Sequence, residues 1–284
     1  MDFYNINDIK SLLARHGFRF SRSMGQNFLI ESWVPRDVVE ASGAGPGTGV
    51  LEIGPGIGPL TANLARRADK VVAVELDRSL LPILTETLAD CPNVSVISAD
   101  VMKLDLAALA AEHFHGLTPL VCANLPYNIT TPVLTALLES GLFAAITVLV
   151  QKEVAQRICS APGKGNYGAF SIFCQYHADT ELLFDVPKEC FLPAPKVTSA
   201  VLRLTPHPAP ACVHDEEFFF RVIAGAFSQR RKTLLNALSS AFPLSKEELR
   251  ECIDRAGLPA DVRGERLSIA EFARLSDELQ ARLP

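Results

Sequence analysis

Between residues 49 and 204 the sequence alternates short, continuous apolar runs with longer amphipathic stretches. Apolar runs separated by helical segments are typical of a mostly parallel sheet that helices cover on both faces. The sequence therefore predicts a Rossmann-like α/β fold whose last strand is antiparallel. The expected strands are Val50–Ile53, Val71–Val74, Val94–Ile97, Leu120–Ala123 and Ile146–Val150, followed by Glu181–Val186 and Ala200–Leu204.

A proline-rich segment at residues 205–210 separates this region from a C-terminal part in which only helices are expected. We predict an α/β domain over residues 1–207, including an N-terminal helix (Ile6–His16) and loop, and a small all-helical domain over residues 208–284. The expected C-terminal helices are Asp215–Ser228, Lys232–Ala241, Ser245–Arg255 and Ser268–Leu283.

Composition narrows the possible classes of protein. The longest apolar stretch, residues 142–150, is shorter than the roughly 18 residues of a membrane helix, and the N-terminus lacks the pattern of a secretory signal. The seven cysteines form no C-x-x-C pair, so neither a disulfide framework nor a zinc site is expected, and the cytoplasm is the predicted compartment. The net charge of −5 argues weakly against nucleic acid as a partner, although local basic clusters matter more than the total.

The first expected strand ends in a glycine-rich turn, which contains Gly54, Gly56 and Gly58 and precedes a helix. Glycine permits positive φ and lets a ligand approach the backbone closely. Glu75 ends the next expected strand, where a carboxylate can accept hydrogen bonds from both ribose hydroxyls of a nucleotide-like cofactor. This pattern predicts a cofactor site, but it does not by itself identify the cofactor.

Two details favour S-adenosylmethionine over a dinucleotide. The glycine spacing is G-x-G-x-G, and Glu52 lies in the preceding strand, where it would repel a pyrophosphate but tolerate a sulfonium cation. Asp100 follows the third strand, where its carboxylate can accept a hydrogen bond from the amine of the cofactor's adenine. Val101 and Met102, which come next, can form an apolar surface for the adenine ring. NAD or FAD, or a purely structural turn, remain as alternatives.

The fourth expected strand ends in Asn124, Leu125, Pro126 and Tyr127. The exocyclic amine of adenine is a poor nucleophile because its lone pair is delocalised into the ring. The Asn124 amide oxygen and the Leu125 carbonyl can accept its hydrogens and direct that lone pair at a methyl donor. Pro126 stiffens the loop, and the Tyr127 ring can stack on a flipped base. The alternative is a simple turn at the end of a strand.

Six motifs occur in an order that resembles the ribosomal RNA adenine dimethyltransferases. They are GQNFL (25–29), LEIGPGIGPLT, VELD, SADVMKLD, NLPYNITTP and FLPAPKV (191–197), and the resemblance extends from about Lys10 to Phe272. It implies a class I methyltransferase fold. It also implies that Asn27 and Leu29 contact the methionine part of S-adenosylmethionine and that Gly54 cradles it. Glu75 would bind the ribose of the cofactor, and Asp100 would bind its adenine. Asn124 would contact both the cofactor and the target amine. Phe191 would stack on the target base, on the face opposite Tyr127.

Three segments resemble the branch of this family that acts on the small ribosomal subunit: Gly163–Gly168, Phe227–Asn236 and Arg263–Leu267. The implied substrate is a pair of adjacent adenosines in the last hairpin of 16S rRNA, which become N6,N6-dimethyladenosine during biogenesis of the 30S subunit. Two alternatives stay open. One is a large-subunit methyltransferase of the macrolide-resistance type, and the other is a protein that acts chiefly as a non-catalytic 30S assembly factor.

A basic cluster lies in the expected helical domain. Arg230, Arg231 and Lys232 are consecutive, and Arg221 lies nearby. Such residues can bind RNA phosphates without reading sequence, although a solvated helix face is the usual alternative. The overall negative charge suggests that recognition requires a preassembled ribosomal particle rather than naked RNA. We expect a monomer, with no metal and no membrane as partner.

Overall fold

The computed structural model describes residues 2–21, 24–210, 212–229 and 231–283. The chain divides into two compact units. The first comprises Met1–Ala155 and Asp179–Pro206, and the second comprises Gln156–Ala178 and His207–Pro284. A domain boundary at residue 207 remains a prediction, and the structure groups residues 156–178 with the C-terminal helices.

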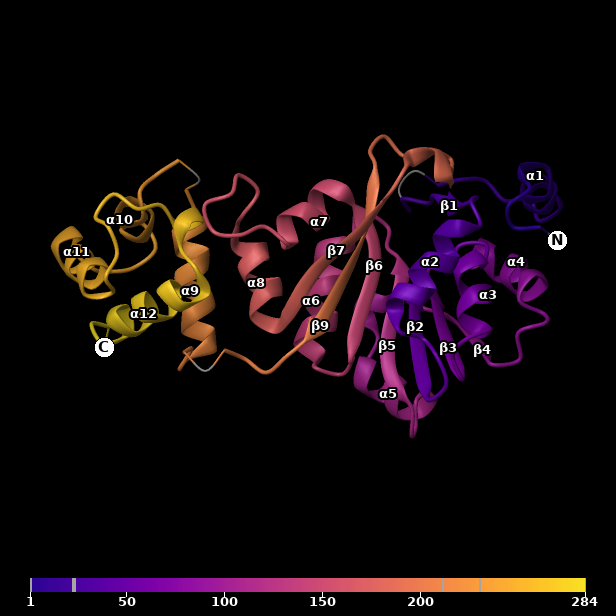
Figure 1. Ribbon diagram of the computed structural model, residues 1–284, viewed down its shortest axis with the longest axis horizontal. Coiled ribbons are helices and arrows are strands. Elements are labelled where there is room, and N and C mark those ends of the chain that lie inside the picture. The colour runs from indigo at the N-terminus through magenta and orange to yellow at the C-terminus, as the bar shows by residue number, and fades with distance from the viewer. Residues whose placement is uncertain (1, 22–23, 211, 230, 284) are drawn as a thin grey trace. The chain divides into compact units, whose positions relative to one another are not determined.

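The first unit is built on a seven-stranded sheet with the order β4-β3-β2-β5-β6-β9-β7 (Figure 1). Strands β4, β3, β2, β5 and β6 are parallel to one another, and β9 is antiparallel to β6. This arrangement confirms the predicted class of fold. The strands are β2 (Thr48–Ile53), β3 (Lys70–Glu75), β4 (Val94–Ser98), β5 (Thr118–Asn124), β6 (Ala145–Gln151), β7 (Ala178–Val186) and β9 (Ser199–Pro206).

The central strands carry continuous apolar runs because both faces of the sheet are covered. Val50 and Leu51 of β2, and Val71 and Val72 of β3, have no exposed surface. Each such side chain contributes about 1.5–3 kcal/mol of hydrophobic stabilisation when it is fully buried. The helices of this part of the chain are α1 (Ile6–Arg15), α2 (Trp33–Ser42), α3 (Pro59–Ala65), α4 (Leu81–Thr87), α5 (Leu106–His113), α6 (Thr130–Ser140) and α7 (Lys152–Ile158), with short 3-10 turns η1 (Arg78–Leu80), η2 (Val101–Lys103) and η3 (Lys188–Cys190).

Within the first unit, a second, two-stranded sheet joins the N-terminal loop to the segment that follows η3. Strand β1 (Phe28–Leu29) pairs antiparallel with β8 (Phe191–Leu192), so that Phe28 lies opposite Leu192 and Leu29 opposite Phe191. The backbone N–H of Ile30 extends this pairing by donating to the Cys190 carbonyl at 2.9 Å. The sequence did not predict either strand, but together they fix the position of residues 28–30.

The second unit consists of helices around an aromatic core. Tyr176, Phe219 and Phe272 are among the largest fully buried side chains of the protein. The Tyr167 hydroxyl donates to the Leu267 carbonyl at 3.0 Å, which ties residues 156–178 to the C-terminal helices. The helices are α8 (Ala169–His177), α9 (Glu216–Phe227), α10 (Leu234–Leu238), α11 (Lys246–Arg255) and α12 (Ile269–Gln280), with the 3-10 turn η4 (Gly264–Arg266).

Sequence-encoded caps define two of these helices. Ser245 and Glu248 at the start of α11, and Ser268 and Glu271 at the start of α12, form reciprocal capping boxes. In this S-x-x-E arrangement each side chain accepts a hydrogen bond from the other residue's backbone N–H. Both helices therefore begin where the sequence predicts them.

Candidate functional site

The glycine-rich turn lies between β2 and α3. Gly54, Gly56 and Gly58 adopt φ values of +69°, +62° and +98°, which residues with a Cβ rarely adopt. A Cβ at position 56 would lie 2.9 Å from a ring carbon of Phe28. The turn is thus held in a left-handed conformation and packs closely under β1.

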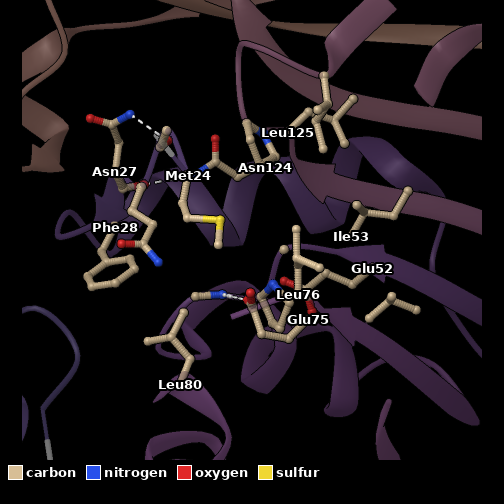
Figure 2. A pocket seen from close by; sticks show the side chains of 18 of the residues that line it. Met24, Asn27, Phe28, Glu52, Ile53, Glu75, Leu76, Leu80, Asn124 and Leu125 are labelled. Atoms are coloured by element: carbon tan, nitrogen blue, oxygen red, sulfur yellow. Dashed lines mark hydrogen bonds between the residues drawn. The ribbon is translucent and has the colours of Figure 1, made fainter. Parts of the chain in front are cut away.

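A cavity opens where β2, β3 and β5 end (Figure 2). In this view, the side chains of Asn27 and Asn124 lie on one side of the cavity, and those of Glu75 and Leu80 lie on the other. Ligands of open α/β sheets bind beyond the carboxyl ends of the strands, so the cavity has the position expected for a cofactor site. The structure brings to it these residues predicted from the sequence: Asn27, Leu29, Gly54, Gly56, Glu75, Asp100, Asn124, Leu125, Pro126 and Tyr127.

Backbone groups orient the Glu75 carboxylate. Its Oε1 accepts from the Asp77 N–H at 2.8 Å, and its Oε2 accepts from the Gly56 N–H at 3.4 Å. Burial raises the pKa of Glu75 above its ordinary value, although these hydrogen bonds oppose the rise. The carboxylate is therefore preset at the end of β3, where ribose hydroxyls can donate to its remaining lone pairs.

Asp100 lies at the other end of the predicted cofactor site and is partly exposed. Its Oδ1 accepts from the Met102 N–H at 3.1 Å, which begins the turn η2. Its Oδ2 lies 3.7 Å from the Lys103 ammonium group. The side chain is thus held at the cavity wall, with Val101 beside it as an apolar surface.

Glu52 is the most unusual ionisable group in the cavity wall. Its side chain is only 1% exposed, and its Oε2 has no hydrogen-bond partner among the described residues. Burial raises the pKa of Glu52 to about 8, and repulsion from Glu75 adds to the rise. Burial thus favours the neutral form of the Glu52 carboxyl when no cation lies beside it.

The tetrapeptide predicted to be catalytic, residues 124–127, begins at the end of β5, and its first residue is already oriented. The Asn124 Nδ2 donates to the backbone carbonyl of Asn27 at 3.1 Å, so the Asn124 Oδ1 is left as the acceptor. The Leu125 N–H donates to the Leu149 carbonyl of β6 at 3.1 Å. The Tyr127 hydroxyl lies 2.6 Å from the Ser199 Oγ, and burial raises the pKa of this phenol.

Gln26 fastens the N-terminal loop and was not singled out from the sequence. Its side-chain oxygen accepts from the Ser21 N–H at 2.9 Å, and its amide nitrogen donates to the Asp77 carboxylate at 2.7 Å. Asp77 is the residue whose N–H orients Glu75. The only sequence signal for this role was the position of Gln26 between Gly25 and Asn27.

Phe191 is the one described catalytic candidate that does not line the cavity. Its side chain is 2% exposed and packs in the core with Leu29 and Val201. In this structure the ring is thus an anchor for the paired strands β1 and β8. Its predicted second role, as an aromatic wall for the target base, stays a prediction.

The basic cluster belongs to the second unit. The Arg221 guanidinium lies 4.6 Å from the centre of the Phe218 ring and 5.6 Å from that of Phe242, in cation–π geometry. Arg231 and Lys232 are exposed in the turn before α10. Arg230 lies outside the described residues.

Among the residues that the structure describes, no group of three or more His, Cys, Asp or Glu side chains could hold a metal ion. In the same residues, no helix is long and apolar enough to span a membrane.

The sheet order, with β9 antiparallel beside β6, and the cofactor cavity beyond β2, β3 and β5 together define a class I methyltransferase. The sequence model for "Ribosomal RNA adenine dimethylase" matches residues 17–281. The chain belongs to the ribosomal RNA adenine dimethylase family, which confirms the resemblance seen in the sequence.

Two similar proteins are named as small-subunit methyltransferases. The ribosomal RNA small subunit methyltransferase A of Geobacillus thermodenitrificans is 48% identical over 277 residues, which cover 95% of this chain and 94% of the relative. The protein of the same name from Alkaliphilus metalliredigens is 46% identical over 276 residues, covering 96% of each chain.

Among solved structures, the 23S rRNA methyltransferase ErmE has a TM-score of 0.66 at 25% identity, covering 89% of this chain and all of ErmE. A dimethyladenosine transferase from Plasmodium falciparum has a TM-score of 0.74 at 22% identity, covering 89% of this chain and 98% of the other, and shares the fold.

Proposed function

We propose that this protein transfers methyl groups from S-adenosylmethionine to N6 of two adjacent adenosines in the 3′-terminal hairpin of 16S rRNA. Each adenosine becomes N6,N6-dimethyladenosine during biogenesis of the 30S subunit in the cytoplasm. The observation that carries the proposal is the Asn124 amide, which is oriented by the Asn27 carbonyl at the edge of the cofactor cavity. The similarity to small-subunit methyltransferases supports the choice of RNA.

The cavity residues fit this cofactor by their chemistry. Asn27 and Leu29 would hold the methionine part, and Gly54 and Gly56 would leave room for it. The Glu75 carboxylate would accept from the ribose hydroxyls, and Asp100 would accept from the adenine amine. Because Glu52 is buried in the same wall, its carboxyl gains from ionising beside a cationic ligand. S-adenosylmethionine supplies an activated methyl group and a neutral thioether as leaving group.

The tetrapeptide at residues 124–127 binds and orients the target base. The Asn124 Oδ1 and the Leu125 carbonyl accept hydrogen bonds from the adenine amine, which favours a pyramidal nitrogen with a directed lone pair. The Tyr127 ring stacks on the flipped base. No strong general base is needed, because the methylated amine is acidic enough to lose its proton to water.

The second unit supplies RNA contacts in this proposal. Arg221, Arg231 and Lys232, with Arg230, bind phosphates and give affinity without sequence specificity. Since the whole chain is acidic, specificity comes from a preassembled 30S precursor that presents the hairpin to a monomeric enzyme. Equal activity on deproteinised 16S rRNA and on subunits would refute this part of the proposal.

The large-subunit activity is the second candidate because ErmE shares the fold at 25% identity. Radiolabelled methyl transfer to unmethylated 30S and 50S subunits, followed by chromatography of the digested RNA, separates the two. We expect dimethyladenosine in the 30S RNA and none after Asn124→Ala. Label in the 50S RNA alone would assign the protein to the other branch. A chiefly non-catalytic assembly role would give binding to 30S precursors without label.

A further inference from the structure

One buried hydroxyl contacts the catalytic loop from outside it. The Ser199 Oγ lies 2.6 Å from the Tyr127 hydroxyl, and the Ser199 side chain has no exposed surface. The two residues are 72 positions apart in the chain. They meet because β9 begins at Ser199, directly opposite Gln151 at the end of β6.

The backbone beside Tyr127 is also held. The Pro126 carbonyl accepts from the Ile129 N–H at 3.2 Å and from the Thr130 hydroxyl at 3.3 Å, which forms a turn at the start of α6. Tyr127 can therefore move only by rotation about its side-chain torsions. A hydrogen bond to the hydroxyl restrains the first of these torsions, which sets where the ring lies, because rotation about the second leaves the hydroxyl oxygen in place.

The Tyr127 and Ser199 hydroxyls can form a stable hydrogen bond. Burial raises the pKa of Tyr127, so its phenol stays neutral and can donate as well as accept. Without the Ser199 hydroxyl, the phenol would be left without this partner in a mostly buried position, which is unfavourable. Because Tyr127 also lines the cavity, its ring would then turn toward water in the cavity and away from its present orientation.

We propose that Ser199 is a positioning residue, which holds the Tyr127 ring at the place in the cavity where the target adenine stacks on it. Ser199 does not touch the substrate, and it acts only through the tyrosine hydroxyl. The inference rests on the proposed function, because it requires a base that enters the cavity beside Tyr127. It adds a residue of β9 to a site that the sequence placed on the loop after β5.

The test is a double-mutant cycle with Ser199→Ala, Tyr127→Phe and the two combined, measured as methyl transfer to ribosomal subunits. We expect each single variant to lower kcat by about tenfold, which corresponds to about 1.4 kcal/mol, with cofactor affinity unchanged. The double variant should lose no more than either single variant, because both remove the same hydrogen bond. Tyr127→Phe keeps the ring and removes the same hydrogen bond, so if Ser199→Ala folds poorly this variant tests the inference alone, and its full activity would overturn it.

The matched control is Thr147→Val, which removes another fully buried hydroxyl from the same sheet, on β6. Its kcat should match that of the wild type. Full activity of Ser199→Ala, or losses that multiply in the double variant, would overturn the inference while the proposed function stands. Failure of the wild-type protein to methylate either subunit would overturn the proposed function, and this inference with it.

Discussion

The buried carboxyl of Glu52 makes the stability of the cofactor-free protein depend on pH in a way that Glu52→Gln should remove. Burial raises the pKa of Glu52 from 4.5 to about 8. Between these two values the native state keeps a proton that the unfolded chain releases. The free energy of unfolding therefore falls as pH rises across this window, and Glu52 contributes no further change above about pH 8.

The size of the effect follows from the width of the window. Each pH unit within it changes the free energy of unfolding by about 1.4 kcal/mol. Between pH 5 and pH 8, Glu52 alone should thus lower the stability by about 4 kcal/mol. Glutamine has a similar shape and no titrating group, so the variant should lack this loss and be the more stable protein at pH 8.

Urea unfolding of both proteins at several pH values, without cofactor, measures the difference directly. Groups that do not interact with Glu52 titrate alike in both proteins and cancel when the two curves are subtracted. Glu139→Gln, on an exposed part of α6, serves as the control and should leave the curve of the wild type unchanged. If the stability difference between Glu52→Gln and the wild type does not change from pH 5 to pH 8, the account of a neutral buried Glu52 is wrong.

Three further changes test the site and the RNA contacts. Glu75→Gln should weaken binding of S-adenosylmethionine by about tenfold or more, measured by calorimetry, because hydrogen bonds to a charged acceptor contribute about 1.5–3 kcal/mol. Gly56→Ala should destabilise the protein by about 2 kcal/mol in urea, since its φ of +62° disfavours a Cβ and Phe28 lies in the way; an unchanged midpoint would contradict this. Replacing Arg231 and Lys232 with alanine should reduce the slope of log affinity for 30S against log salt by about 2, and an unaltered slope would remove them from the RNA interface.

The strands of the main sheet were predictable because both faces are buried. Continuous apolar runs such as Val71–Val74 have no other common explanation between helical segments, and the structure places them in β3. The meeting of the polar residues that end these strands was also predictable, because the carboxyl ends of neighbouring parallel strands lie at one edge of the sheet. Glu75 and Asn124 thus lie at the cavity as expected.

The contacts that were not predicted join distant parts of the chain. Strands β1 and β8 are two residues long, and such short elements form only because the partner strand is already in place. The same holds for the bond between Tyr127 and Ser199, which depends on the register of β9 against β6. Local sequence patterns carry no information about a pairing of this kind. The burial of Phe191 follows from its place opposite Leu29 in that short sheet.

The hydrogen bond between Asn27 and Asn124 has a consequence for how this enzyme tolerates mutation. The group that orients the catalytic amide is a main-chain carbonyl, and every amino acid at position 27 carries one. Exchange of the side chain at position 27 removes its hydrogen bond to the Gly25 carbonyl but keeps the acceptor for Asn124, whereas a one-residue insertion or deletion between Gly25 and Phe28 displaces that acceptor. The orientation of Asn124 therefore depends on the length of this loop as well as on its side chains.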